Sequence, residues 1–206
     1  MKFCKSDNQN PVKEFLDALP SKDAQKISWV LRLVEESDWL PVQYFFQEEE
    51  DRELWEIRIT VDFKNYWLLA FAYQDDWVLC NADFSTTTQK AFQNEKAEAR
   101  KVAKNYKPPF WFLSQNDLHK YIKKRKKQND GFDKNFEEGY LHFKIGAILR
   151  QARQEAKLTQ AEIADKLGLS STVISRVENH AEELSLDLLQ DYVHTWSKKL
   201  NNVLTA

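Results

Sequence analysis

The first half of the chain changes from helical to strand periodicity. Apolar side chains recur every three or four positions over residues 12–19 and 27–34, which predicts two short helices separated at Pro20. Between residues 54 and 61 apolar and polar side chains alternate, as they do in a half-buried strand. The pattern therefore predicts two helices, then an antiparallel meander, then a third helix. The other strands of the meander are predicted over residues 42–46, 66–73 and 77–84, and the third helix over residues 91–106.

The second half of the chain is helical in composition. Lys107-Pro108-Pro109 ends the preceding helix, because proline cannot continue it, and marks a domain boundary. The predicted fold class is α+β, in which a domain of helices and antiparallel sheet precedes an all-α domain. Helices are predicted over 113–128 and 134–156, with a series of short helices over 158–200. The predicted domains are residues 1–107, a linker and helical segment over 108–144, and a last domain over 145–206.

The formal net charge of −2 alone does not indicate a nucleic-acid partner, but its distribution is uneven. Residues 1–110 hold 15 Lys or Arg and 19 Asp or Glu, a net of −4, whereas residues 111–206 hold 15 and 13, a net of +2. A basic run, Lys120–Lys127, lies in the second part. Such a run contacts a nucleic acid or an acidic partner, or it is the solvated face of a helix. The sequence leaves these interpretations open.

The sequence lacks the signals of disulfide-bonded, metal-binding, nucleotide-binding and membrane proteins. Cys4 and Cys80 form neither a disulfide framework nor a metal-binding pair, so we expect free thiols. No phosphate loop or nucleophile motif is present, and the histidines show no ligand spacing, so we expect neither metal nor cofactor. Those histidines are His119, His142, His180 and His194. Without a signal peptide or an apolar run of about 18–20 residues, we expect a cytoplasmic protein with no membrane partner.

The stretch from Leu158 to Asn179 has the signals of two short helices joined by a tight turn. Thr159 and Glu162 fit a capping box at the first helix start. Gly168 can adopt positive φ where that helix ends, and Ser170 can cap the next helix. The apolar positions that would turn inward are Ile163, Ala164, Leu167, Val173, Ile174 and Val177.

That arrangement leaves small hydroxyls and one cation on the outside of the second helix. The outward residues are Ser171, Thr172, Ser175 and Arg176, and we expect these, with Ser170, to contact base edges and phosphates in a DNA major groove. Gln160, at a helix start, can pair with a phosphate. The alternative is a helical hairpin that only packs.

Residues 146–200 resemble the Cro/C1 repressor (Xre) family in capping, turn glycine and core spacing together. The resemblance implies a recognition helix from about Ser171 to Glu178 and an ion pair between Arg153 and Glu178. Lys157 departs from the family, because many members have Gly before the Leu-Thr-Gln run. A single copy offers few phosphate contacts, so we expect a homodimer on two half-sites of operator DNA.

The first domain resembles a HigB/RelE-like toxin of the phage-Gp49-like branch. The resemblance rests on the order of elements, on Leu54-Trp55-Glu56-Ile57-Arg58 on a strand, and on Thr88-Gln89-Lys90 after the last strand. Residues 117–199 resemble the HigA antitoxin, with Gly139-Tyr140 and Phe143-Lys144-Ile145-Gly146 before the repressor-like part. The chain therefore resembles a fusion of toxin and antitoxin, in which the two parts contact each other within or between chains.

Toxins of that family cleave mRNA on the ribosome without a metal, and the resemblance assigns catalytic roles to Arg58 and Lys90. Trp67 stands where related toxins often carry Arg, Thr86 and Thr87 where they carry lysines, and the loop Glu48–Asp51 adds negative charge that repels RNA. These differences indicate a weak or lost nuclease. The alternatives are a strand Arg58 paired with Glu56 and a solvated Lys90.

Two functions of different class follow. The first is a sequence-specific DNA-binding transcriptional autorepressor with a neutralised or degenerate toxin-like domain. The second is a ribosome-dependent mRNA interferase kept inactive by its fused antitoxin. A scaffold that sequesters a separate toxin or antitoxin is a third interpretation.

Overall fold

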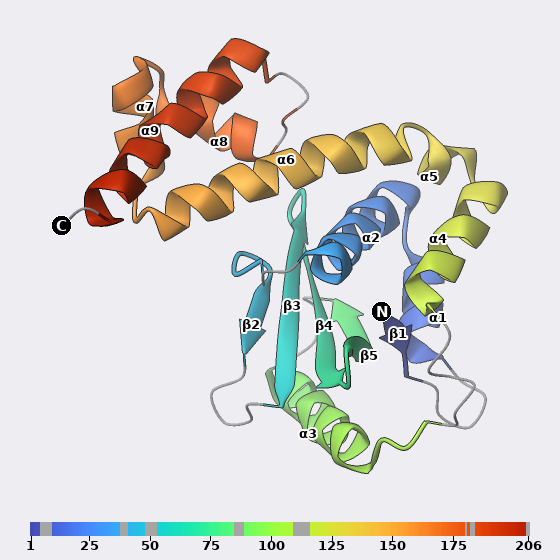
Figure 1. Cartoon of the computed structure of the whole chain (residues 1–206). Coiled ribbons are helices and arrows are strands. Elements are labelled where there is room, and N and C mark those ends of the chain that lie inside the picture. Colours follow the sequence, from blue (N-terminus) through green and yellow to red (C-terminus); the bar gives the residue numbers. More distant parts are fainter. Residues whose placement is uncertain are drawn as a thin grey trace. The chain divides into compact units, whose positions relative to one another are not determined.

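The computed structural model describes residues 1–4, 10–37, 41–47, 53–84, 89–108, 116–179, 181 and 184–204. The chain divides into two compact units, Met1–Lys134 and Asn135–Ala206, which Figure 1 draws in one view. The first unit combines helices with a five-stranded sheet, and the second is helical throughout its described part. The α+β class predicted from the sequence is confirmed.

The sheet of the first unit has the strand order β1-β5-β4-β3-β2. Neighbouring strands from β2 to β5 are antiparallel, as the alternation of apolar residues predicts, whereas β1 pairs with β5 in parallel. The periodicity does not predict β1, because two residues are too few to show a period. The strands are β1 (Lys2–Phe3), β2 (Phe45–Gln47), β3 (Leu54–Val61), β4 (Lys64–Tyr73) and β5 (Asp76–Phe84).

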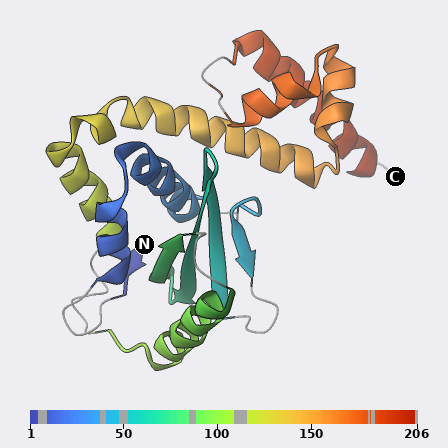
Figure 2. The ribbon, with the colours of Figure 1, turned by 180° about the vertical axis from the view of Figure 1, so that it is seen from behind.

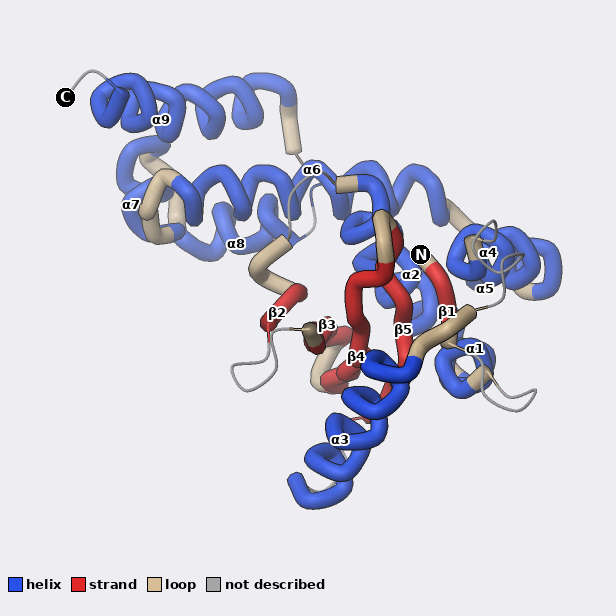
Figure 3. Tube along the Cα trace, turned by 60° about the horizontal axis from the view of Figure 1, so that its bottom comes forward, coloured by secondary structure: helices blue, strands red, loops and turns tan. Residues whose placement is uncertain are grey.

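Helices cover both faces of this sheet (Figure 3). Helices α1 (Pro11–Ala18) and α2 (Ser21–Glu36) cover one face, where Tyr66 of β4 packs edge-on against Phe15 and donates a hydrogen bond to Asp23. Helix α3 (Gln89–Asn105) covers the other face. Its Ala99 belongs to a core cluster with Leu54, Leu69, Phe71, Val78 and Cys80. The sheet is thus buried on both sides, which explains the continuous apolar run in β4.

Two further helices of the first unit, α4 (Asp117–Gln128) and α5 (Asp130–Asp133), pack against α1 and α2. The Tyr121 hydroxyl donates to the carbonyl oxygen of Leu16 at 3.0 Å. The Arg125 guanidinium donates to the carbonyl oxygens of Asp17 and Leu19 at 2.9 and 2.8 Å, close to the C-terminus of α1. The sequence divides the chain at the double proline, whereas these contacts join residues 117–133 to the first unit.

The second unit consists of α6 (Phe136–Glu155), α7 (Gln160–Leu167), α8 (Ser171–Asn179) and α9 (Leu186–Leu204), seen from behind in Figure 2. The helices enclose one apolar core, whose members include Leu149, Ile163, Ile174, Val177 and Tyr192. Helix α9 spans 19 residues, longer than the short helices predicted for this region.

Candidate nucleic-acid interface

The turn between α6 and α7 is fixed by backbone hydrogen bonds. Lys157 has φ +53°, and its N–H bonds to Gln154 O while the Leu158 N–H bonds to Arg153 O. This pair of bonds is the Schellman arrangement, in which the left-handed position usually holds Gly. The position where the sequence departs from the family pattern therefore adopts the left-handed conformation with a lysine.

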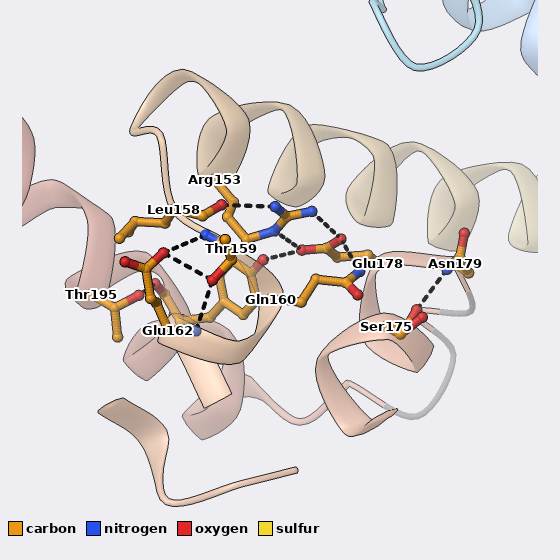
Figure 4. Close-up of polar contacts among 10 residues, drawn as sticks. Arg153, Leu158, Thr159, Gln160, Glu162, Ser175, Glu178, Asn179 and Thr195 are labelled. Atoms are coloured by element: carbon orange, nitrogen blue, oxygen red, sulfur yellow. Dashed lines mark hydrogen bonds and ion pairs between the residues drawn. The ribbon is translucent and has the colours of Figure 1, made fainter. Parts of the chain in front are cut away.

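A capping box begins α7 and a left-handed glycine ends it. The Thr159 hydroxyl accepts from the Glu162 N–H at 3.1 Å, and the Glu162 carboxylate accepts from the Thr159 N–H at 2.7 Å (Figure 4). Gly168 has φ +65°, and the Ser170 hydroxyl accepts from the Val173 N–H at the start of α8. The capping box and the positive φ predicted from the sequence are confirmed. Together they fix the angle between α7 and α8 through local interactions.

The outer surface of α8 carries the polar residues expected to read DNA. Ser171, Thr172 and Arg176 are exposed, whereas Ile174 and Val177 are buried in the core. Ser175 is half-buried, and its carbonyl oxygen accepts from the Asn179 side chain at 2.7 Å. Ser170 is exposed, although its hydroxyl also serves as the cap. Short hydroxyl side chains and a planar guanidinium suit the hydrogen-bonding edges of base pairs.

A buried carboxylate, Glu178, holds the helices of this unit together. Arg153 Nε and Nη2 donate to its two oxygens at 2.5 and 2.8 Å, and the Tyr192 hydroxyl donates at 2.5 Å. Burial alone would raise the pKa of Glu178, but the hydrogen bonds from Arg153, Tyr192 and Gln160 outweigh it and leave that pKa below its usual value. The carboxylate therefore remains charged and connects residues of α6, α7 and α9 to the end of α8.

The Gln160 side chain takes part in the same network. Its Nε2 donates to a Glu178 oxygen at 2.8 Å, as Figure 4 shows, and the side chain is half-buried. The sequence pattern predicts a phosphate contact for Gln160. In this structure one amide hydrogen is engaged by Glu178, which leaves the second hydrogen, and those N–H groups at the start of α7 that the capping box does not use, as donors toward an anion.

Gly146 allows α6 and α8 to approach closely. A Cβ atom placed on Gly146 would lie 2.6 Å from the Glu178 carbonyl oxygen and 3.1 Å from that of Val177. Both neighbours are backbone atoms, so they cannot rotate away. A glycine within an otherwise regular helix was the available sequence signal for this contact.

In the first unit, Arg58 of β3 is engaged by neighbouring side chains. Its Nη2 donates to Glu56 at 3.0 Å, and its guanidinium lies 4.5 Å from the centroid of the Phe46 ring. Glu56 is only 1% exposed, and the Lys96 ammonium of α3 lies 3.6 Å from it. Trp67 pairs with Arg58 across β3 and β4. The structure thus places the predicted catalytic arginine in an ion pair at the sheet surface.

The second predicted catalytic residue cannot be placed beside Arg58. Lys90 lies in the first turn of α3, and its side chain is outside the described part of the chain. Thr86, Thr87, Thr88 and the acidic loop Glu48–Asp51 also lie outside the described residues.

Comparison with known families matches one part of the chain. A family model of helix-turn-helix domains matches residues 149–195, which cover α7, α8 and parts of α6 and α9. Searches of curated proteins and of solved structures gave no match. The chain therefore carries a helix-turn-helix domain of the Cro/C1 type, and this domain supports a role in DNA binding and transcription regulation.

Membrane-spanning helices and clustered metal ligands are both absent from the described part of the chain. Among the described residues, none of the helices combines the length and the apolar character that crossing a membrane requires. Over the same residues, no three His, Cys, Asp or Glu side chains are grouped as metal ligands would be.

Sequence reasoning did not identify Tyr192 as part of the site. Tyr192 lies 14 positions from Glu178, on a helix whose register depends on the fold of the whole unit. Only the folded unit brings its hydroxyl to the carboxylate.

Proposed function

We propose that this protein is a sequence-specific transcriptional repressor that binds operator DNA through α8. The observation that supports this proposal best is the exposed row of Ser171, Thr172 and Arg176 on a helix whose inner face is locked by Glu178. A rigid backbone behind polar side chains is what direct reading of base edges requires. Gln160 and the start of α7 supply a phosphate contact that sets the register.

We propose further that the repressor acts as a homodimer on its own promoter. One recognition helix reaches a few base pairs, so two half-sites about one helical turn apart would supply the affinity of a repressor.

The first unit is, in this proposal, a toxin-like domain fused to its antitoxin. The order of α1, α2, the antiparallel strands β2–β5 and α3 agrees with the resemblance to HigB/RelE-like toxins. The engagement of Arg58 by Glu56 supports a neutralised or degenerate nuclease, because a cation paired with a buried carboxylate is poorly available to a phosphate. The alternative function, a ribosome-dependent mRNA interferase, would require Arg58 to leave that pair.

The decisive experiment is selection of bound sequences from a random duplex library by the full-length protein, followed by affinity measurements on the selected duplex. Arg176→Ala should weaken binding to that duplex about tenfold to hundredfold, since one good base contact contributes about 1–3 kcal/mol. Lys166→Ala is the matched control, because it removes another exposed cation of the same unit, from the C-terminal end of α7. It should change binding about threefold or less.

Absence of any enriched sequence at low salt, or equal effects of the two substitutions, would contradict the repressor. The interferase is tested separately by inducing residues 1–107 alone, without the antitoxin-like part that would hold the enzyme inactive, and following mRNA integrity in the cells. Cleavage that disappears with Arg58→Ala would favour the enzyme over the repressor.

A further inference from the structure

The basic run of the sequence does not belong to the helix-turn-helix unit. Residues 135–206 hold eight Lys or Arg and ten Asp or Glu, a net charge of −2. Residues 1–134 hold the remaining 22 of the 30 basic residues and 22 of the 32 acidic residues, so their net charge is zero. Of the eight, Arg153 is buried against Glu178. The excess of positive charge after residue 110 thus lies in α4, in the first unit. A DNA-binding unit with net negative charge gains little from the attraction to phosphates that supplies non-specific affinity.

Helix α4 is held in one rotational orientation by its inner face. Leu118 and Tyr121 are buried, Tyr121 and Arg125 bond to carbonyl oxygens at the end of α1, and the Asp117 carboxylate accepts from the Phe3 N–H at 3.1 Å. These contacts recur every three or four residues, so they fix which side of α4 faces solvent.

The opposite side is a row of lysines, which we call the α4 lysine ridge. All four are exposed, and the two adjacent lysines in the middle lie three or four residues from the lysine at either end, so all four share one side of the helix. The ridge consists of Lys120, Lys123, Lys124 and Lys127. Lys126, by contrast, turns toward Asp133 with 3.3 Å between the charged atoms.

Helix stability does not account for this arrangement. Cations favour the last turn of a helix, where Lys127 lies, but Lys120 lies at the end of the first turn, where positive charge opposes the helix dipole. Like charges three and four residues apart also repel one another. A polyanion laid along the ridge would relieve that repulsion.

The chemistry of the ridge favours duplex DNA over other polyanions. Protein interfaces have an apolar centre, and single-stranded nucleic acids bind on aromatic side chains. The exposed residues of α4 offer no apolar centre and only one aromatic ring, the imidazole at the start of the helix, since they are His119, Lys120, Lys123, Lys124, Lys127 and Gln128. Point charges alone suit the phosphate backbone of a duplex, which carries one charge per about 1.7 Å of helix axis.

We propose that the α4 lysine ridge is a second DNA contact, which binds the phosphate backbone and supplies affinity without sequence information. This inference rests on the proposed function, since it assumes that the helix-turn-helix unit brings the chain to DNA. Because both units are in one chain, binding of either raises the effective concentration of the other at the same duplex.

The test uses the full-length protein with Lys120, Lys123, Lys124 and Lys127 all changed to Gln. Fluorescence anisotropy measures affinity for the selected duplex and for an unrelated duplex of equal length over a range of salt concentrations. The slope of log affinity against log salt should become shallower by about 0.9 for each phosphate that the variant no longer neutralises, up to about 3.6 for one ridge and about 7.2 for the two ridges of the proposed homodimer. Affinity for both duplexes should fall about tenfold or more, with their ratio unchanged.

Two matched variants isolate the position of the charge. Changing Lys22, Lys101, Lys104 and Lys107 to Gln removes the same charge from exposed positions elsewhere in the first unit, and should leave the slope as in the unchanged protein. Changing the four ridge lysines to Arg keeps the charge on the ridge and should also leave the slope unchanged. Circular dichroism verifies that each variant is folded.

The outcomes separate this inference from the repressor itself. If the unchanged protein selects a duplex but the ridge variant has the same salt slope as the control variant with Lys22, Lys101, Lys104 and Lys107 changed to Gln, the ridge inference fails and the repressor stands. If single-stranded RNA or polyglutamate competes for the ridge better than duplex DNA, the assignment of the partner is wrong. If no duplex is bound at all, the proposed function fails first.

Discussion

Each unit of this protein buries a carboxylate, and the two surround it differently. Glu178 accepts hydrogen bonds from Arg153, Gln160 and Tyr192, whose side chains come from three helices. Glu56 accepts from Arg58, which belongs to the same strand and is 51% exposed, with Lys96 3.6 Å away. In the second unit the buried charge fixes the helices and leaves Arg176 at the surface. In the first unit the buried carboxylate pairs with Arg58, the residue to which the resemblance to the toxin family gives a catalytic role.

The difference shows that the burial of the paired cation decides whether a buried carboxylate fixes the helices or engages a residue at the surface. The Arg153 guanidinium is itself buried, so its ion pair with Glu178 lies inside the unit and holds α6 against the end of α8. The half-exposed Arg58 has a choice between Glu56 and solvent, so its pair is weaker. Substitutions at the two carboxylates and at their neighbours measure this contrast.

The largest effect is expected from Glu178→Ala. It leaves Arg153 buried without its main partner, and removal of one member of a buried pair costs about 3–5 kcal/mol. Replacing both residues, Arg153→Leu with Glu178→Leu, should recover most of that loss, because no unpaired charge remains. Denaturant unfolding of the second unit measures Glu178→Ala, the double variant and the two matching single variants, Arg153→Leu and Glu178→Leu. Losses that simply add would show that the pair is not coupled.

Gly146→Ala is expected to have the next largest effect. The added methyl would meet backbone atoms of Glu178 and Val177, so α6 and α8 must separate, at a cost of about 1–3 kcal/mol. DNA binding should fall with stability, because α8 shifts. Ile148→Ala, at an exposed position of the same helix, is the control and should stay within about 0.5 kcal/mol. Unchanged stability in Gly146→Ala would mean that the backbones of the two helices leave room for a methyl group.

Glu56→Ala should cost less than Glu178→Ala, about 1–2 kcal/mol. Arg58 can turn toward water, whereas the buried Lys96 loses the carboxylate that lies 3.6 Å from it. Thr60→Ala changes an exposed residue on the same strand and serves as the reference, with an effect within about 0.5 kcal/mol. The comparison of the two carboxylates breaks down if unfolding of the first unit shows a loss as large as that of Glu178→Ala.

The two units also differ in how much the sequence reveals. In the second unit the signals are local: Thr159 and Glu162 are three residues apart, and Gly168 immediately follows α7. In the first unit the alternation in β3 predicts the strand, but β1 is too short to carry a pattern. The contact of Tyr121 with Leu16 joins positions 105 residues apart, which no local pattern encodes. The double proline therefore suggests that α4 belongs to a separate linker segment, whereas its buried face packs within the first unit.

The smallest effect concerns the turn that leads into α7. Lys157 occupies a left-handed conformation, which costs an ordinary residue about 1–2 kcal/mol, while glycine brings an unfolded-state entropy cost of about 0.4–1 kcal/mol. Lys157→Gly should therefore stabilise the second unit by about 0.5–1 kcal/mol relative to Lys157→Ala, which removes the same charge but keeps the Cβ atom. Thermal unfolding of the two variants gives the difference. Equal midpoints would show that the strain of a Cβ atom in the left-handed conformation is no larger than the entropy cost of glycine, and the departure from glycine would then be neutral.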